Sequence, residues 1–304
     1  MHSHHDHGHG HGHAQHFDTH NRSFALAVVL NVVFVAIEAV YGVLSGSLAL
    51  LADAGHNLSD VLGLIMAWVA SWMATKKATD RNTYGLKKST ILAALFNALF
   101  LIAAVGGIAW EAIGRFSEPA EVTGLTVIVV AGIGVVINGL TMLLFMKGQE
   151  GDLNIRGAFL HMAADTAVSV GVVVAGLVIM FTGLNWIDPL VSLVIAAVIF
   201  LGTWRLLKDS LNLAVDAVPR EINPEQVLDS LKELPGVESV HHLHIWGLST
   251  TENALTVHLV KPDPASDDKV IEQATRMLAS DFNIHHVTIQ REREAGSCPT
   301  LAYC

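Results

Sequence analysis

Six long apolar segments restrict what this chain can fold into. They cover residues 24–44, 48–74, 89–115, 123–147, 155–181 and 187–205. A helix needs about 20 apolar residues to cross a hydrocarbon core of about 30 Å, and each segment is close to or above that length. Of the 304 residues, 52% are hydrophobic and 15% are charged, whereas a soluble protein carries about 25% charged residues. The sequence therefore predicts an α-helical membrane protein with six transmembrane helices.

The loops between these segments differ in charge. Basic residues gather between the second and third segments and flank the loop between the fourth and fifth: Lys76, Lys77, Arg81, Lys87, Lys88, Lys147 and Arg156. The alternate loops, residues 45–47, 118–122 and 182–184, contain no lysine or arginine. Because basic loops stay on the cytoplasmic side, the pattern predicts cytoplasmic N- and C-termini. Histidines stand where a signal peptide would have a basic and then an apolar stretch, so we expect no cleaved signal.

The first 22 residues form a histidine-rich region. Its histidines are His2, His4, His5, His7, His9, His11, His13, His16 and His20. Short histidine-rich tracts are typical of metal binding, so we interpret residues 1–22 as a cytoplasmic tail that collects metal. A purification tag is the alternative, but the irregular, interrupted spacing argues against it.

The chain changes character after residue 208, where a soluble domain is expected to follow the membrane domain of residues 23–208. A helix from Asn223 to Leu234 is followed by alternating strands at 237–246 and 254–261, a helix at 266–280 and a strand at 284–290. This αββαβ order predicts a ferredoxin-like domain over residues 209–294. A tail at 295–304 holds Cys298 and Cys304, which are too few for a disulfide framework and are expected to be thiols in a reducing compartment.

Two membrane segments repeat one polar spacing. His56 and Asp60 lie four residues apart in the second segment, and His161 and Asp165 repeat that spacing in the fifth. Residues four apart share a helix face. The two segments enter from opposite sides, and about ten residues at 1.5 Å each bring both pairs near the middle of the bilayer. The pairs can therefore converge into one site.

The composition of these pairs favours a metal. A charge in the bilayer centre costs about 2.5–3.5 kcal/mol on insertion scales, so carboxylates there are usually functional, with a structural hydrogen bond as the alternative. Two imidazoles and two carboxylates suit a tetrahedral divalent ion such as Zn²⁺. Protons compete for the same ligands near neutral pH, which makes binding reversible.

Other polar residues in the membrane segments are weaker candidates. Asp53 lies almost on the stripe of Asp60, where it either lines an exit path or supports the site. Asn31, Glu38 and Asn138 are expected to be hydrogen-bond partners between helices rather than ligands.

Several functional classes are disfavoured. No His-Glu-x-x-His motif supports a membrane metallohydrolase, and no P-loop supports a pump driven by ATP. The formal net charge of −10 argues against a nucleic-acid partner. A secondary transporter driven by protons is the preferred hypothesis, and a membrane metal sensor or receptor and, less favoured, a metallohydrolase are the alternatives.

The motifs resemble those of one family. Asp53-Ala-Gly-His56-x-x-x-Asp60, His161-x-x-x-Asp165, the six segments, the histidine tail and the C-terminal domain are similar to bacterial zinc-type members of the cation diffusion facilitator family. The resemblance implies a homodimeric exporter, not an enzyme, in a bacterial inner membrane. It would exchange cytoplasmic Zn²⁺, with Co²⁺ or Cd²⁺ as lesser substrates, for external protons by alternating access. The implied transport site is His56, Asp60, His161 and Asp165.

The resemblance also implies cytoplasmic metal sites. They would use positions matching His244, His258, His285 and Glu292, with Cys298 and Cys304 completing another site. The family's cysteine pair is often Cys-x-x-Cys, whereas five residues separate the two cysteines here. Strand alternation predicts that His242 and His244 face one side and His241 the other. Zn²⁺ bound there would be a regulatory ligand that joins the cytoplasmic domains of the dimer.

Overall fold

The computed structural model describes residues 32–118, 120–146, 153–265 and 267–294. Its contacts divide the chain into two compact units. The first takes the chain up to Val61 together with Ala103–Phe200, and the second takes Leu62–Ile102 and everything from Leu201 onward.

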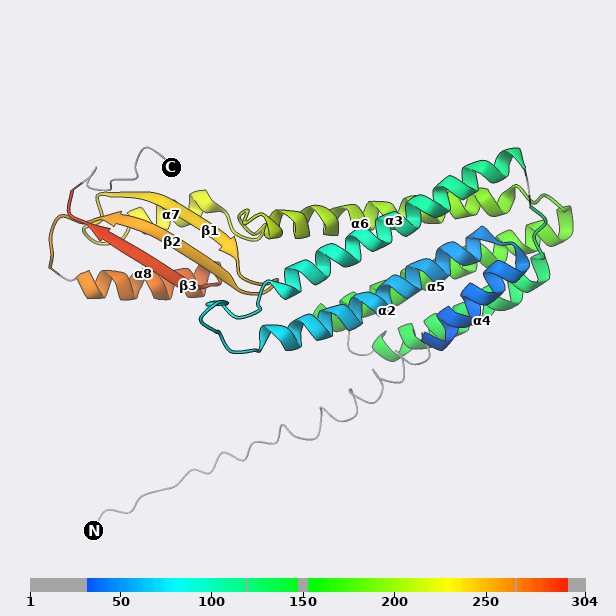
Figure 1. Ribbon diagram of the computed structural model, residues 1–304, viewed down its shortest axis with the longest axis horizontal. Helices are drawn as coiled ribbons and strands as arrows, with labels where there is room; N and C mark the ends of the chain where they lie inside the picture. The colour runs from blue at the N-terminus through cyan, green and yellow to red at the C-terminus, as the bar shows by residue number, and fades with distance from the viewer. Residues whose placement is uncertain (1–31, 119, 147–152, 266, 295–304) are drawn as a thin grey trace, which may run out of the picture. The chain divides into compact units, whose positions relative to one another are not determined.

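Five helices are long and apolar enough to cross a membrane. They are α2 (Leu48–Ala74), α3 (Ser89–Ser117), α4 (Gly124–Met146), α5 (Leu153–Thr182) and α6 (Ile187–Ala214) (Figure 1). A shorter apolar helix, Val32–Ser45, is the described part of the first expected segment, whose earlier residues lie outside the described ranges. Large apolar side chains such as Trp68, Trp110 and Phe181 are exposed, as expected for helices surrounded by lipid.

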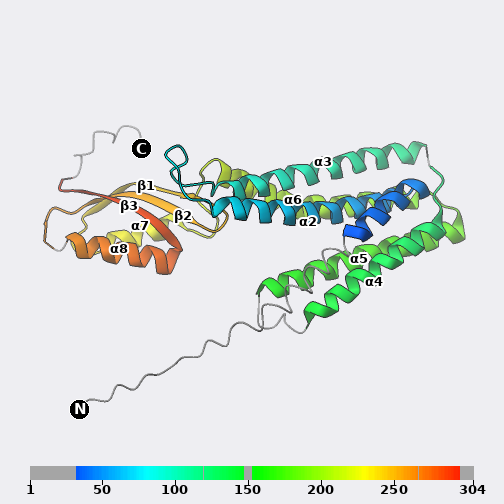
Figure 2. The same ribbon diagram turned by 60° about the horizontal axis from the view of Figure 1, so that its bottom comes forward.

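In the first unit, glycines let α4 and α5 approach closely, and both views show the two helices side by side (Figures 1 and 2). A Cβ atom at Gly124 would lie 2.9 Å from the backbone oxygen of Gly176. A Cβ atom at Gly134 would lie 2.6 Å from Phe34 of the first helix. Small residues at such contacts are typical of helix packing in membranes.

Helix α6 is longer than its apolar segment. The sequence predicted an end near residue 205, but the helix continues to Ala214. Neither glycine nor proline interrupts residues 203–216, so the polar turns after Arg205 stay helical. The chain leaves the helix at Asp216, whose φ of 61° is in the left-handed region.

The soluble part of the second unit has the expected αββαβ order. Its elements are α7 (Pro224–Lys232), β1 (Ser239–Gly247), β2 (Asn253–Val260), α8 (Asp267–Phe282) and β3 (Ile284–Glu292). The sheet order is β1-β2-β3, with β1 antiparallel and β3 parallel to β2. Both helices cover one face of the sheet (Figure 2) and bury a core that includes Val227, Leu231, Leu255 and Leu278. The predicted fold class is confirmed.

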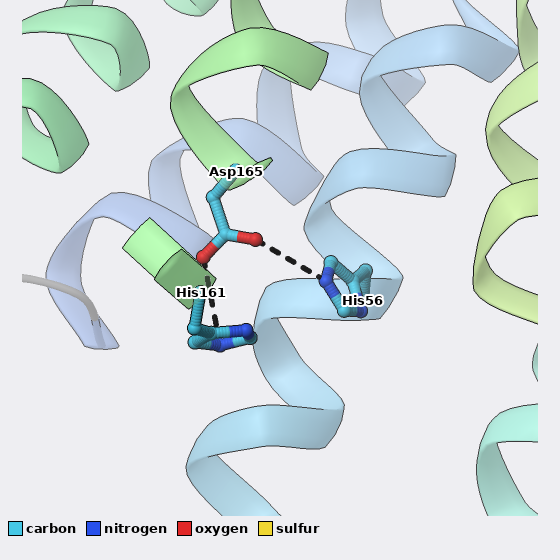
Figure 3. Close-up of side chains that lie close together, drawn as sticks. All are labelled: His56, His161 and Asp165. Carbon is cyan, nitrogen blue, oxygen red and sulfur yellow. Dashed lines mark ion pairs between the residues drawn. The ribbon is translucent and has the colours of Figure 1, made fainter. Parts of the chain in front are cut away.

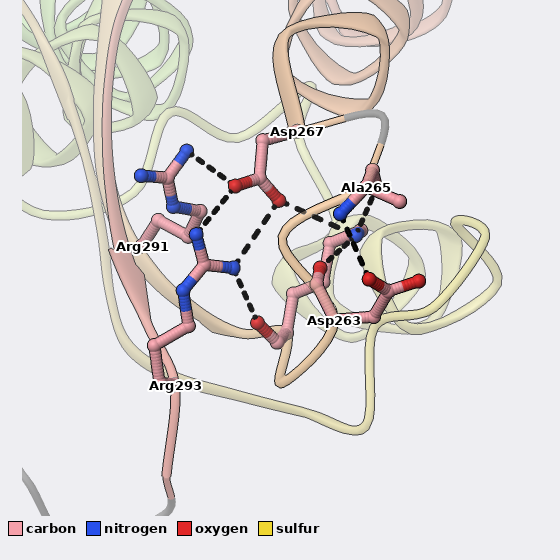
Figure 4. A network of polar contacts seen from close by, with 6 residues as sticks. Asp263, Ala265, Asp267, Arg291 and Arg293 are labelled. Carbon is pink, nitrogen blue, oxygen red and sulfur yellow. Dashed lines mark hydrogen bonds and ion pairs between the residues drawn. The ribbon is translucent and has the colours of Figure 1, made fainter.

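An ion-pair network around Asp267 joins the start of α8 to the end of β3 (Figure 4). Arg293 Nη2 lies 2.6 Å from Asp267 Oδ2, Arg291 Nη1 lies 2.7 Å from it, and Lys261 Nζ lies 3.3 Å from Oδ1. The Lys261 ammonium also donates to the backbone oxygens of Asp263 and Ala265. The buried carboxylate of Asp267 is therefore surrounded by three cations.

The soluble domain contacts the membrane helices within the second unit. Lys87 forms an ion pair with Glu252 in the β1–β2 turn, and Lys88 Nζ lies 2.5 Å from Asp216 Oδ1. The backbone N–H of Thr250 donates to Thr90 Oγ1 at 3.1 Å. These contacts fix the β1–β2 turn beside the start of α3.

Candidate functional site

Helix α2 carries His56 and Asp60, and a carboxylate from α6 anchors its first turn. Asp188 accepts hydrogen bonds from the backbone N–H groups of Leu48 at 2.7 Å and Ala49 at 3.3 Å, and from Ser47 Oγ at 2.5 Å. A carboxylate at a helix N-terminus satisfies free N–H groups and interacts favourably with the helix dipole. The first turn of α2 is therefore anchored within the first unit. Sequence reasoning missed Asp188, because its partners are about 140 residues away.

The two His–Asp pairs meet, as the sequence predicted. His56 and Asp60 come from one face of α2, and His161 and Asp165 come from one face of α5; three of the four are shown in Figure 3. His56 Nε2 lies 3.6 Å from Asp60 Oδ2 and 3.4 Å from Asp165 Oδ1. His161 Nε2 lies 3.2 Å from Asp60 Oδ2 and 3.6 Å from Asp165 Oδ2. Imidazoles and carboxylates thus alternate around a ring.

The spacing of this ring fits a tetrahedral metal. Bonds of about 2.0–2.2 Å to Zn²⁺ place neighbouring ligand atoms of a tetrahedron about 3.3–3.6 Å apart. The four nitrogen–oxygen distances, 3.2 to 3.6 Å, lie in or next to that interval. Ligand atoms of His56, His161 and Asp165 all lie within 4.8 Å of one another, and Asp60 joins them through both imidazoles. Small movements would therefore complete a four-ligand site.

The ring is buried on one side and open on the other. The Asp165 side chain is 3% exposed and that of His56 is 19% exposed, whereas those of Asp60 and His161 are 31% and 42% exposed. Asp60 Oδ2 and His56 Nδ1 are buried and have no hydrogen-bond partner among the described residues. The ring therefore has two side chains that the protein does not enclose and ligand atoms that are not fully used.

Further polar residues lie buried beside the ring. Asn57 donates to Glu38, and Ser169 donates to Asp53. The Asn57–Glu38 bond joins the first helix to α2, which agrees with the hydrogen bonding between helices expected for Glu38. The Ser169–Asp53 bond joins α5 to α2, which is consistent with a supporting role for Asp53. Asn138 is buried without a described hydrogen-bond partner for its amide, and Asn31 lies outside the described residues.

A second cluster of possible ligands lies in the soluble domain. His258 Nδ1 is 2.8 Å from Glu292 Oε1, and His241 Nε2 is 3.3 Å from Glu292 Oε2. The His242 ring stacks on that of His258 with centroids 4.8 Å apart. Partial burial, His258 and His241 lower the pKa of His242, so the imidazole favours its neutral form. Two imidazoles and a carboxylate fit a divalent cation, and the buried His241 Nε2 has no hydrogen-bond partner in the described chain.

The expected alternation of the β1 histidines is wrong. The register of β1 against β2 shifts between His241 and His244, and His242 has a φ of 51°. This irregularity breaks the period of two, so the rings of His241 and His242 lie 5.3 Å apart instead of on opposite faces. The run of adjacent histidines gave no signal of it.

The other expected cytoplasmic ligands are placed differently. His244 is exposed, and its ring lies 6.3 Å from that of His242. His285 Nε2 lies 3.0 Å from Asn283 Oδ1 at the start of β3, about 16 Å along the strand from the residue paired with His258. Cys298 and Cys304 lie outside the described residues. Of the expected set, the structure brings together His258 and Glu292, and His241 joins them.

Comparison with known proteins identifies the family. The cation efflux transmembrane domain matches residues 24–213, and the cation efflux protein cytoplasmic domain matches residues 219–294. The chain belongs to the cation efflux family. It is therefore a membrane transporter and not an enzyme, and the expected family is confirmed.

Curated members of the cation efflux family match along most of the chain. The metal cation efflux system protein CzcD of Cupriavidus metallidurans is 38% identical, over 89% of this chain and 86% of its own length. The cadmium, cobalt and zinc/H(+)-K(+) antiporter of Bacillus subtilis is 37% identical over 89% and 88%, and the zinc transporter ZitB of Escherichia coli is 36% identical over 90% and 88%. A solved metal-bound C-terminal domain of the CzcD transporter is 40% identical, covering 23% of this chain and 99% of that one, with a TM-score of 0.22.

Proposed function

We propose that this transporter exports divalent metal cations, chiefly Zn²⁺ and to a lesser extent Co²⁺ or Cd²⁺, from the cytoplasm in exchange for protons. The observation that carries the proposal is the ring of His56, Asp60, His161 and Asp165, whose nitrogen–oxygen distances of 3.2–3.6 Å suit a tetrahedral ion. Relatives named as zinc transporters and as a cadmium, cobalt and zinc/H(+)-K(+) antiporter support it.

The same ring explains how the ion is released. Imidazole nitrogen must be neutral and carboxylate must be ionised to bind a metal, so each ligand can take up a proton when the metal leaves. Mixed nitrogen and oxygen ligands hold Zn²⁺ without the thiolates of permanent structural sites. Alternating access would expose the ring to the cytoplasm for metal loading and to the outside for exchange with protons.

The rest of the chain has proposed roles in the same cycle. Both termini would be cytoplasmic in a bacterial inner membrane, with the tail (1–22), membrane domain (23–208), regulatory domain (209–294) and cysteine-containing tail (295–304) in order. The match to the family's cytoplasmic domain supports a homodimer. Zn²⁺ would bind His258 and Glu292 together with His241, and His244, His285, Cys298 and Cys304 remain candidates for further ligands.

A membrane metal sensor is the rival, because the same ring could bind metal without moving it. Transport by purified protein in liposomes separates the two. An imposed pH gradient should drive zinc uptake, and Asp165→Ala should abolish it, because the most buried carboxylate of the ring is lost. Asp229→Ala, which removes an exposed carboxylate of α7, is the matched control and should transport normally. Uptake that ignores the gradient, or full uptake by Asp165→Ala, would refute proton-coupled export through this ring.

A further inference from the structure

Two buried carboxylates beside the metal ring have no assigned role in transport. Glu38 lies on the Val32–Ser45 helix and Asp53 on α2, and both are 0% exposed. Each receives one hydrogen bond: Asn57 Nδ2 donates to Glu38 Oε2 at 3.3 Å, and Ser169 Oγ donates to Asp53 Oδ2 at 3.1 Å. The other two oxygens, Glu38 Oε1 and Asp53 Oδ1, are buried without a hydrogen-bond partner among the described residues.

The two carboxyl groups also lie within hydrogen-bonding reach of each other. Two ionised carboxylates in contact inside a membrane domain repel, and neither is solvated. One proton between them would remove a charge and supply the donor that both unpaired oxygens lack. The pair is thus built to hold a proton.

Among the described residues, no lysine or arginine acts on this pair. The titratable groups that do so are His56 from α2 and Asp165 from α5, both members of the metal ring. Helix α4, which packs against the first helix at Gly134 and Phe34, contains no ionisable residue. The charge of the pair therefore responds mainly to the charge state of the ring.

We propose that Glu38 and Asp53 form a second proton-binding site, which holds one shared proton when the metal ring is empty and gives it up when a divalent cation binds. This inference rests on the proposed proton-coupled export.

The proton balance follows from electrostatics. Burial away from water favours the protonated pair when the ring is empty, and the negative charge of Asp165 acts in the same direction, whereas a protonated His56 would oppose it. A bound divalent cation cancels the two negative charges of the ring, so the ring no longer repels negative charge on the pair and release of the proton becomes less costly. The proton leaves from a carboxyl oxygen to water on the side where the metal entered, and another returns when the metal departs on the other side. No covalent bond other than O–H breaks or forms.

The final ratio of zinc inside to zinc outside liposomes, reached when net uptake stops, tests this exchange. With the membrane potential clamped, the logarithm of the accumulation ratio rises with the imposed pH difference, and the slope equals the number of protons exchanged per metal. Losing one coupled proton lowers the accumulation ratio about tenfold for each unit of pH difference. We expect Glu38→Gln to lower the slope by about one relative to the unsubstituted protein.

Glutamine suits the test because its N–H can donate to Asp53 where the shared proton would lie. The variant therefore mimics the protonated pair but cannot release the proton. Asp53→Asn makes the same replacement from α2 and should give the same slope. Glu111→Gln is the matched control, because it removes an exposed carboxylate of α3. It should keep the slope of the unsubstituted protein.

Unchanged slopes in both Glu38→Gln and Asp53→Asn would overturn the inference and leave a purely structural hydrogen-bonding role. An imposed K⁺ gradient provides a further test. If it drove zinc accumulation in the unsubstituted protein but not in Glu38→Gln, the pair would bind K⁺ instead of a proton and the inference would be overturned. A flat slope in the unsubstituted protein would instead refute the proposed antiport. If both variants fail to fold, infrared difference spectra of the unsubstituted protein decide: zinc binding must remove a protonated-carboxyl band, and its persistence overturns the inference.

Discussion

At the scale of single residues, the cluster of His241, His258 and Glu292 in the soluble domain depends on the backbone of His242. Its φ of 51° lies in the left-handed region, which costs free energy for a residue with a side chain. The resulting irregularity in β1 brings His241 to Glu292 and beside His258 on β2. A strand without it would present His241 on the other face of the sheet.

This geometry predicts which β1 histidine binds metal. In a chain that lacks residues 1–22 and carries Asp165→Ala, zinc binding should report the cluster in the soluble domain. His241→Ala should weaken it by at least about 10- to 100-fold, the loss that follows even removal of an outer-shell partner. His286→Ala, which removes an exposed histidine of β3, is the control and should bind zinc nearly normally. Equilibrium titration with zinc measures both, and an equal loss in His286→Ala would contradict the assignment.

The ion pairs of Asp267 make the stability of the soluble domain depend on pH. The hydrogen bond of Asp267 with Arg293, and then Lys261 and Arg291, hold the pKa of the carboxyl below its ordinary value. A carboxyl with a depressed pKa stabilises the fold above its unfolded pKa of about 3.9, and this contribution is lost as pH falls through the lower folded value.

Urea unfolding followed by circular dichroism should therefore show stability falling below about pH 4. Asp267→Asn should be less stable at neutral pH and lose less stability on acidification. Asp268→Asn, the exposed neighbour in the same helical turn, should keep the pH dependence of the unsubstituted protein. Identical acid profiles for Asp267→Asn and Asp268→Asn would argue against the network as the source.

At the scale of elements, the packing of α4 against α5 positions half of the metal ring. A Cβ atom at Gly176 would lie 2.9 Å from Ile128 Cγ1 and 3.2 Å from the backbone oxygen of Gly124. Backbone atoms in a packed helix pair move little, so a methyl group there pushes the helices apart. Helix α5 also carries His161 and Asp165, so its displacement reaches the ring.

Gly176→Ala should consequently destabilise the membrane domain by about 1–3 kcal/mol, the range for overpacking. Gly171→Ala on the same helix is the matched control, because nothing lies within 4 Å of its added methyl group. Gly171→Ala should change the free energy of unfolding by no more than about 1 kcal/mol, and the change should be stabilising because alanine has the higher helix propensity. Unfolding in mild detergent measures both variants. Equal stability of the two would show that the α4–α5 contact tolerates a methyl group.

At the scale of the whole molecule, local periodicity explains what the sequence could predict. Residues four apart share a helix face, which pairs His56 with Asp60 and His161 with Asp165. The length of the apolar segments predicts the transmembrane helices. The fold and the ring could therefore be predicted from local rules. Asp188 and His241 did not. Asp188 acts on α2 from a distant helix, and His241 depends on a bulge that strand alternation does not reveal. The pairing of Glu38 with Asp53 likewise needed the tertiary fold.

The second unit joins the soluble domain and the adjoining ends of α2, α3 and α6 in one compact body. The Lys87–Glu252 pair is part of its join, with side chains 31% and 48% exposed. A half-exposed pair contributes about 0.2–1 kcal/mol, and salt screens it. Its role is therefore to orient the β1–β2 turn against α3 more than to stabilise the fold.

Charge reversal tests that orientation. Lys87→Glu and Glu252→Lys should each weaken the join by like-charge repulsion, whereas the double variant should recover it, with a coupling free energy of about 0.2–1 kcal/mol at low salt. Thermal unfolding of the unsubstituted protein, both single variants and the double variant in detergent gives the coupling free energy. The measurement is repeated at high salt, where screening should erase the coupling. The Arg276–Glu272 pair on α8 is the control: its exchange alters only one exposed helix turn, so it should leave the join and the zinc transport rate unchanged. If the Lys87–Glu252 double variant unfolds at as low a temperature as the single variants, the turn is held by the residues themselves and not by their opposite charges.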